Sequence, residues 1–108
     1  MSKRTPEMYL EDIKQAIESI IQYTTGFTLA DFMKDKKTSD AVIRNLEIIG
    51  EAGKNLLRLD QGAYPAVAWE EIIGLRNIIT HEYFGVDLEN IWETVKNDLP
   101  LLKEQLAK

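Results

Sequence analysis

Apolar residues recur at spacings of three and four along most of this chain, which is the periodicity of helices with one buried face. No run alternates convincingly between apolar and polar residues, as a half-buried strand would. The pattern predicts an all-α protein, an antiparallel four-helix bundle with a short extra helix and a kinked C-terminal helix. Since 108 residues suffice to bury one core, we expect a single helical domain over residues 1–108.

The first helix is expected to begin after Thr5, which can act as its N-cap, with Pro6 at the first helical position. It should run to about Tyr23, because Gly26 follows as a stop. The positions that recur along its buried face are Leu10, Ile13, Ile17, Ile20, Ile21 and Thr24.

A short helix is expected next, because Thr28 and Asp31 have the spacing of a capping pair. This helix should run through Met33. The charged residues 34–37 are then expected to form a solvated loop rather than a patch that binds nucleic acid.

A long helix should start at Thr38 or Ser39. Its apolar stripe comprises Val42, Ile43, Leu46, Ile49, Ala52, Gly53, Leu56 and Leu57. Gly50 and Gly53 each cost about 1 kcal/mol relative to alanine inside a helix, which predicts that another backbone passes close to them, as at a tight helix crossing. The polar residues on the other faces are Arg44, Asn45, Glu47, Glu51 and Lys54, and the sequence leaves open which of them assist a site.

Residues 60–65 combine aspartate, glycine and proline and form the clearest break in the chain. The third main helix should begin near Val67 and end around residues 83–85, at a glycine. Asp87 should cap the fourth helix. The apolar face of that helix comprises Leu88, Ile91, Trp92, Val95 and Leu99. Pro100 lacks an N–H, so the helix must kink or restart there.

The third main helix carries the one stretch that suggests chemistry. It contains the only histidine, His81, which follows Arg76 and Asn77 and precedes Tyr83. An arginine fork can hold phosphate oxygens, and an imidazole can move a proton near neutral pH. Asn77 lies one helical turn before His81 and can orient the ring or bind phosphate. This set suits the cleavage of RNA phosphodiesters.

The outward face of the same helix suggests an interface. Its buried face is expected to consist of Ile72, Leu75 and Ile79. Asn77 and His81 would then point away from the core. Ile73 and Phe84 would lie beside them. An outward face with apolar residues around a histidine looks like a contact between subunits.

Composition limits the alternatives. The chain has no cysteine and a single histidine, so we expect no disulfide, no thiol chemistry, no metal centre and no cofactor. No stretch approaches the roughly 20 apolar residues that span a bilayer, and no leader is recognisable, so a cytoplasmic protein without a membrane partner is expected. The net charge of −5 counts against tight, nonspecific binding to nucleic acid, although a few well-placed cations suffice for local cleavage.

The motif Arg76-x4-His81-x-Tyr83 resembles the R-x4-H-x-Y signature of HEPN-domain proteins, specifically the HepT-like branch that accompanies minimal nucleotidyltransferases. The similarity extends from about residue 9 to residue 102. Outside the motif it rests on residues 44–52, Tyr64, Pro65, Trp69, Asp87, Trp92 and residues 98–100.

This resemblance implies a metal-independent ribonuclease toxin that acts on RNA as a homodimer, with the motifs of both subunits meeting in an interfacial cleft. His81 would act as general base or acid on the ribose 2′-hydroxyl, and Arg76 would stabilise charge at the phosphorus, assisted by Asn77. The partner antitoxin would be a minimal nucleotidyltransferase that transfers AMP to Tyr83.

Two other hypotheses stand beside this one. The chain could be a non-catalytic adaptor whose acidic surface docks a basic nucleotidyltransferase, in which case Arg76 and His81 would matter to binding and not to RNA. It could also be a helical oligomerisation module with an incidental histidine. RNA cleavage that depends on His81 separates the first hypothesis from both.

Overall fold

The computed structural model describes residues 3–74 and 87–107, and every regular element in those residues is a helix. The elements are α1 Pro6–Thr24, α2 Leu29–Lys34, α3 Lys36–Leu59, α5 Leu88–Glu93, the π-helical turn η1 Thr94–Asp98 and α6 Leu99–Leu106. Residues 69–74 are also helical. The predicted all-α class is confirmed, with α2 as the short extra helix. None of the described helices is long and apolar enough to cross a membrane.

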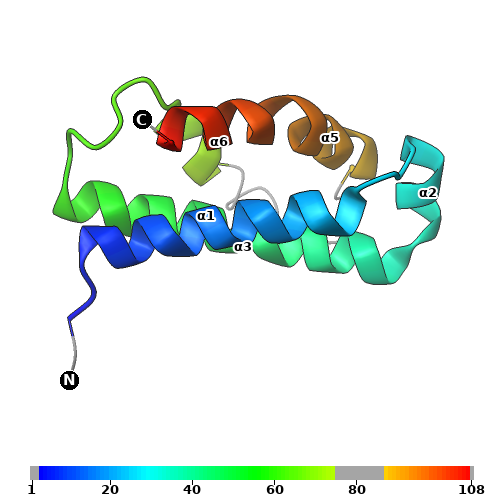
Figure 1. Cartoon of the computed structure of the whole chain (residues 1–108), viewed down its shortest axis with the longest axis horizontal. Coiled ribbons are helices and arrows are strands. Elements are labelled where there is room, and N and C mark those ends of the chain that lie inside the picture. Colours follow the sequence, from blue (N-terminus) through cyan, green and yellow to red (C-terminus); the bar gives the residue numbers. More distant parts are fainter. Residues whose placement is uncertain (1–2, 75–86, 108) are drawn as a thin grey trace.

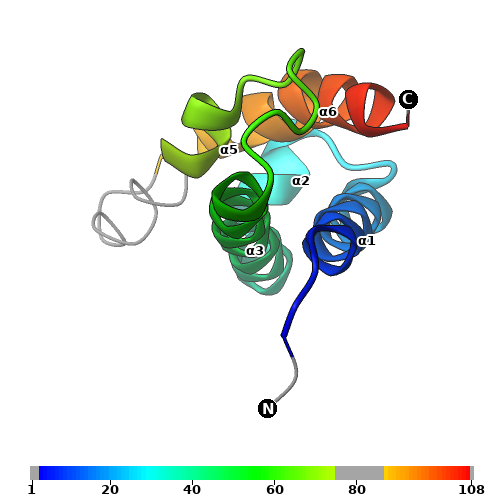
Figure 2. The same cartoon turned by 90° about the vertical axis from the view of Figure 1, so that its left-hand side faces the viewer.

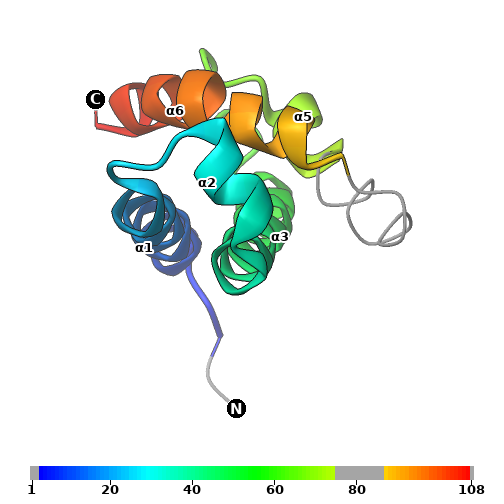
Figure 3. The ribbon, with the colours of Figure 1, turned by 90° about the vertical axis from the view of Figure 1, so that its right-hand side faces the viewer.

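Two long helices form one layer of the bundle. α1 and α3 lie side by side and run in opposite directions, and α2 joins them at one end (Figure 1). The C-terminal stretch from α5 to α6 lies across one side of this pair as a second layer (Figure 2). α2 contacts both α3 and α5 (Figure 3). The largest fully buried side chains of the core are Phe32, Ile13, Ile17, Ile20, Leu46, Leu106 and Val42.

α1 begins and ends close to where the sequence predicts. The Thr5 hydroxyl accepts a hydrogen bond from the Met8 N–H at 3.2 Å and so caps the first turn. At the other end the buried Thr24 hydroxyl donates to the Ile20 carbonyl at 2.8 Å. Gly26 then turns the chain with a φ of +79°, a conformation that glycine adopts at little cost. The helix therefore ends where its last carbonyls are satisfied and glycine follows.

α2 begins at the predicted capping pair. The Thr28 N–H donates to Asp31 Oδ2 at 3.0 Å, and the Asp31 N–H donates to Thr28 Oγ1 at 3.1 Å. These reciprocal bonds satisfy two N–H groups that a helix start otherwise leaves free. Phe32 projects from this short helix and is fully buried. A six-residue helix is thus held by its cap and by one core aromatic side chain.

The predicted loop at residues 34–37 is wrong, because α3 starts at Lys36 and not at Thr38 or Ser39. Asp35 is the N-cap of α3. Its carboxylate accepts hydrogen bonds from the Thr38 N–H at 3.0 Å and from the Thr38 hydroxyl at 2.8 Å. The charged residues suggested a loop, but Asp35 is a residue type that favours the N-cap position, and it caps the helix through Thr38.

α3 buries the stripe that the sequence predicts. Its buried residues are Ser39, Val42, Leu46, Ile49, Gly50, Ala52, Gly53 and Leu56. Ile43 and Leu57 are half-buried at the edges of the stripe and pack against the core. The helix therefore has one broad apolar face that contacts α1 and the C-terminal layer.

Gly53 makes room for an aromatic side chain. A Cβ at Gly53 would lie 3.1 Å from Cζ3 and 3.2 Å from Cε3 of Trp69. The predicted close backbone is therefore wrong at this position, because the neighbour is an indole ring. That ring is 7% exposed, and its Nε1 donates to the Ala63 carbonyl at 2.9 Å. The indole thus ties the loop after α3 to the helix that begins with Trp69.

The predicted break at residues 60–65 is present, but it extends to residue 68, and the next helix starts at residue 69 rather than near Val67. A turn closed by the Val67 N–H and the Tyr64 carbonyl at 2.9 Å occupies the expected first turn. Tyr64 has a φ of +47°, which is unusual for a side chain of this size. The predicted end of this helix, at residues 83–85, lies outside the described residues.

Asp87 caps α5 as predicted, and the irregularity expected at Pro100 takes the form of the π-helical turn η1 directly before α6. In η1 the Leu99 N–H donates to the Thr94 carbonyl, five residues back instead of four. Because Pro100 has no N–H for the Lys96 carbonyl, the helix widens over the turn before it. Val95, Leu99 and Leu102 remain buried on both sides of the widened turn.

We expect Trp69→Phe to lower the free energy of unfolding by about 1–3 kcal/mol, because the buried Ala63 carbonyl would lose its donor. Urea unfolding followed by circular dichroism measures this. Trp92→Phe is the matched control, since a phenyl ring can still face Phe32, whose centroid lies 5.2 Å from that of Trp92. Equal losses in the two variants would contradict the role given to the Trp69 hydrogen bond.

We also expect a loss of stability in acid that depends on the Asp35 cap. The Thr38 N–H and hydroxyl lower the pKa of Asp35, so the unfolded state binds more protons near pH 4. This contribution is present above the unfolded pKa and is lost as the pH falls through the folded one.

Asp35→Asn keeps a capping side chain but cannot titrate, so its Tm should fall less between about pH 5 and pH 2 than the wild-type Tm. Thermal unfolding across this range measures the difference. Asp31, whose pKa is lowered by the Thr28 N–H and hydroxyl, remains in the variant and should leave a residual slope. Parallel curves for the two proteins would show that the Asp35 cap contributes nothing to acid sensitivity.

Candidate functional site

The predicted catalytic residues Arg76, Asn77 and His81, and the predicted AMP acceptor Tyr83, lie in residues 75–86, outside the described residues. Their roles therefore stay predictions. The structure does describe the residues on either side of this segment, and a groove on the neighbouring helices.

The chain that leads into the segment is fixed against α3. Trp69 packs on Gly53, and Ile72 and Ile73 are half-buried against the core. The Ile73 Cγ1 would lie 3.8 Å from a Cβ at Gly53. The prediction that Ile73 points outward is therefore wrong, because the space left by glycine lets this side chain approach α3. The outward face described from the sequence loses one of its apolar residues.

A helix cap and core packing also hold the chain that follows the segment in place. The Asp87 carboxylate accepts hydrogen bonds from the Glu89 N–H at 3.0 Å and the Asn90 N–H at 3.3 Å, as predicted for a cap. Ile91 is 4% exposed. The ring centroids of Trp92 and Phe32 are 5.2 Å apart. α5 is thereby held against α2 directly after residue 86.

Four of the residues that carry the family resemblance outside the motif have structural roles here. Trp69 fixes the helix before the segment, while Asp87 and Trp92 fix the helix after it. Pro100 sets the widened turn that orients α6. These contacts hold the described chain on both sides of residues 75–86.

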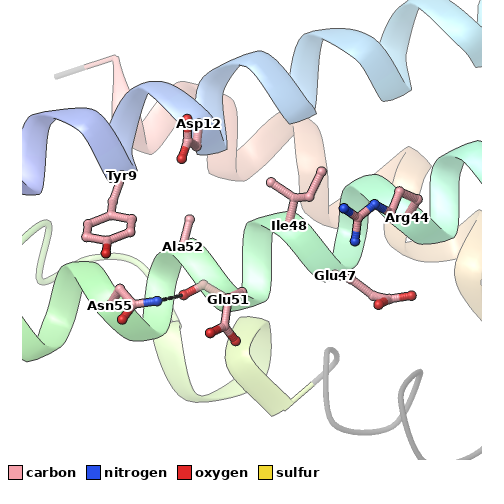
Figure 4. Close-up of a pocket in the computed structure, with 8 residues that line it drawn as sticks. All are labelled: Tyr9, Asp12, Arg44, Glu47, Ile48, Glu51, Ala52 and Asn55. Atoms are coloured by element: carbon pink, nitrogen blue, oxygen red, sulfur yellow. Dashed lines mark hydrogen bonds between the residues drawn. The ribbon is translucent and has the colours of Figure 1, made fainter. Parts of the chain in front are cut away.

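A groove lies on the face of α1 and α3 that is turned away from α6 (Figure 4). Its volume is about 390 Å³. It is lined by Tyr9 and Asp12 from α1 and by Arg44, Glu47, Ile48, Glu51, Ala52 and Asn55 from α3. Three of the five polar residues that the sequence left open, Arg44, Glu47 and Glu51, therefore share this groove.

The other two polar residues of α3 lie elsewhere. The Asn45 amide donates to the Ala41 carbonyl at 2.9 Å, and its side chain lines an adjoining hollow. Lys54 is exposed and is not among the residues that line either hollow. Within the described part of the chain, no three carboxylates or histidines gather closely enough to hold a metal ion. The groove is suited to polar and ionic contacts with another molecule.

The contribution of α1 to this groove was not predicted from the sequence. Tyr9 and Asp12 are followed by Ala16 and Ser19 at spacings of three and four, which places a polar and small stripe beside the apolar one. That spacing was the available signal. Polar residues on a helix surface usually face water, so the stripe alone did not indicate a groove.

The comparisons with known proteins agree with the resemblance drawn from the motif. The family model described as "Ribonuclease HepT-like" matches residues 13–108. A protein of Thermococcus cleftensis named "Probable ribonuclease HepT" is 47% identical over 106 residues, which cover 98% of this chain and 96% of that protein.

Two further relatives cover the chain almost completely. A protein of Caldanaerobacter subterraneus subsp. tengcongensis named as a "Putative RNase" is 44% identical, over 97% of this chain and 94% of its own length. One from Methanocaldococcus jannaschii with the same description is 40% identical, over 98% of this chain and 97% of its own length. No solved structure matches the chain. Because the family model spans residues 13–108 and these relatives match nearly end to end, the chain belongs to the HepT-like ribonuclease family.

Proposed function

We propose that this protein is a metal-independent endoribonuclease toxin of a toxin–antitoxin pair, which cuts RNA with the motif Arg76-x4-His81-x-Tyr83 in the cleft of a homodimer. The observation that carries the proposal is that the family match runs through residues 13–108 and so includes the whole motif. The names of the relatives support ribonuclease chemistry in particular. The fixed flanks of residues 75–86 support a site there, since catalytic groups need defined positions.

The proposed reaction uses the ribose 2′-hydroxyl as the internal nucleophile. The 2′-oxygen forms a bond to phosphorus, the bond from phosphorus to the 5′-oxygen breaks, and the products are a 2′,3′-cyclic phosphate and a 5′-hydroxyl. His81 either takes the proton of the 2′-hydroxyl or gives one to the leaving 5′-oxygen, since imidazole with a pKa of about 6.5 can do both near neutral pH.

Arg76 acts on the phosphate in this mechanism. Its planar fork can hold two phosphate oxygens while negative charge builds up on them. Asn77, one helical turn before His81, orients the imidazole or binds a phosphate oxygen. Tyr83 is the control point, because an AMP group on its hydroxyl adds bulk and negative charge where the substrate phosphate must bind.

We expect His81→Ala to reduce RNA cleavage by a factor of roughly 10²–10⁴, because the proton transfer loses its catalyst. The intact mass of each purified protein is first measured to show that it carries no AMP. The cleavage of cellular RNA by these proteins is then measured in excess chelator. Gln22→Ala, at an exposed position of α1, is the control and should cleave as the wild type does.

A substrate with a single 2′-deoxyribose at the cleavage site should resist cutting, because the internal nucleophile is gone. Two results would count against the proposal. One is cleavage by His81→Ala at the wild-type rate, and the other is cleavage that the chelator stops in wild type.

For regulation, we expect Tyr83→Phe to cleave RNA but to escape its antitoxin. The Tyr83 hydroxyl oxygen would attack the α-phosphate of ATP, pyrophosphate would leave, and the hydroxyl proton would be lost. Phenylalanine lacks that oxygen. The experiment incubates protein with a minimal nucleotidyltransferase and ATP, then measures intact mass and residual RNA cleavage.

Tyr23→Phe is the matched control, because Tyr23 is 42% exposed on α1 and lies away from the motif in sequence. It should still gain AMP and lose activity. If Tyr83→Phe gained AMP and lost activity as the control does, the modified residue would have to be sought elsewhere.

The alternative is a non-catalytic adaptor that binds a nucleotidyltransferase. The acidic residues of the α1–α3 groove and the net charge of −5 favour a basic partner under either hypothesis. An unmodified wild-type protein that cleaves no RNA would select the adaptor.

A further inference from the structure

We propose that the α1–α3 groove is the docking site for a basic amphipathic helix of a partner protein, and that Arg4 of the chain itself fills the arginine position of this site in the free protein. The inference goes beyond the proposed function and does not depend on it, because neither RNA cleavage nor modification of Tyr83 enters the argument.

The groove follows the seam between two helices. Two adjoining hollows of about 390 Å³ each share Asp12 and Ile48, so they form one continuous depression. The second hollow adds Gln15, Ala16, Ser19 and Asn45. Among the described elements, α2, α5 and α6 all lie on the other side of α1 and α3 (Figure 2). Within the described part of the chain, no other helix covers the depression, which runs along a pair of helices of 19 and 24 residues.

The floor of the groove is low and apolar. Ala16 and Ala52 are each 4% exposed, and their small side chains let another helix approach closely. Ile48 is half-buried, lines both hollows and gives an incoming apolar side chain a surface to contact. A single apolar row flanked by polar rims fits an amphipathic helix, which presents one apolar stripe.

The rims carry more acid than base. Among the described lining residues, Asp12, Glu47 and Glu51 are acidic and Arg44 is the one cation. Glu51 already interacts within the chain, so Asp12 and Glu47 are the carboxylates offered to a partner. A second copy of this chain is a poor occupant on electrostatic grounds, because each copy has a net charge of −5. A helix with Arg or Lys beside its apolar stripe has the complementary charge.

Arg4 shows how such a cation is held. Its guanidinium forms an ion pair with Asp12, lies 4.8 Å from the centroid of the Tyr9 ring, and donates to the Met8 carbonyl at 3.3 Å. A carboxylate, an aromatic face and a carbonyl around one planar cation make an arginine-binding site. The chain thus fills with its own N-terminal arm the end of the groove that a partner would use.

This internal contact can be exchanged. The side chains of Arg4 and Asp12 are 41% and 42% exposed, and ion pairs at such positions contribute little to stability and weaken in salt. Arg4 lies outside α1, which begins at Pro6, so its arm can leave without unfolding a helix. A partner arginine that also brings an apolar stripe would therefore displace it.

The test uses the full chain labelled with ¹⁵N and a synthetic amphipathic helical peptide with an Ala/Leu stripe flanked by arginines. A matched peptide carries glutamates in place of the arginines. The side-chain amides of Gln15, Asn45 and Asn55 line the groove and should shift with the arginine peptide only. The side-chain amide of Gln105 on α6, which donates to the Ala66 carbonyl, should not shift.

Fluorescence anisotropy then measures the affinity of the wild type and of three variants for the arginine peptide. Arg4→Ala should bind the arginine peptide several-fold more tightly than wild type, because the site is no longer filled from within. Asp12→Asn should bind it several-fold more weakly. Glu89→Gln makes the same change of charge at an exposed position of α5 and should leave affinity unchanged.

The proposal is overturned by any of four results. These are equal binding of the two peptides, shifts at Gln105 in place of the groove amides, equal affinity of Arg4→Ala and wild type, or equal effects of Asp12→Asn and Glu89→Gln. Groove signals that move with protein concentration alone would make this face a contact between copies of the chain and would also overturn it. No RNA is present, so none of these results bears on the ribonuclease proposal.

Discussion

The packing of α1 against α3 is the constraint on which the rest of the structure depends. These are the two longest described helices, and their apolar faces meet through fully buried residues such as Ile13, Ile17 and Leu46. Each helix has one apolar face, so the pair leaves apolar surface on one side that other elements must bury. The opposite side is more polar and can stay in contact with solvent. α5 and α6 cover the first side (Figure 2). The second side becomes the groove.

A small number of specific contacts positions the helices that pack on the α1–α3 pair. Gly53 on α3 leaves space for the Trp69 indole, which in turn holds the Ala63 carbonyl of the preceding loop. Further along, Trp92 contacts Phe32 of α2. Each contact lies a few residues from one end of segment 75–86. A change in either would therefore alter the position from which the motif-bearing segment starts or ends, without touching a motif residue.

Local signals in the sequence were sufficient for much of this fold. Thr5, Thr28 and Asp87 cap helices as predicted, because a cap depends on residues within one turn of it. The Asp35 cap follows the same rule and was missed only because the charges around it suggested a loop. The apolar faces were also predicted, since periodicity fixes which side of a helix is buried.

What the sequence could not supply depends on contacts between elements. The orientation of Ile73 and the neighbour of Gly53 are both set by where the helix at residues 69–74 meets α3. Asp12 and Tyr9 became groove residues only once α1 and α3 were paired. The predicted catalytic residues rest on the motif and its resemblance to a family, and they lie outside the described residues.

The acidic balance of the chain also separates the two proposed partners. RNA requires local cations, and with a net charge of −5 they must come from a few placed residues such as Arg76. The groove has the opposite character, because Asp12, Glu47 and Glu51 would repel phosphate. A basic helix in the groove would thus not compete with RNA for the same contacts, and it would reduce the negative potential that RNA meets.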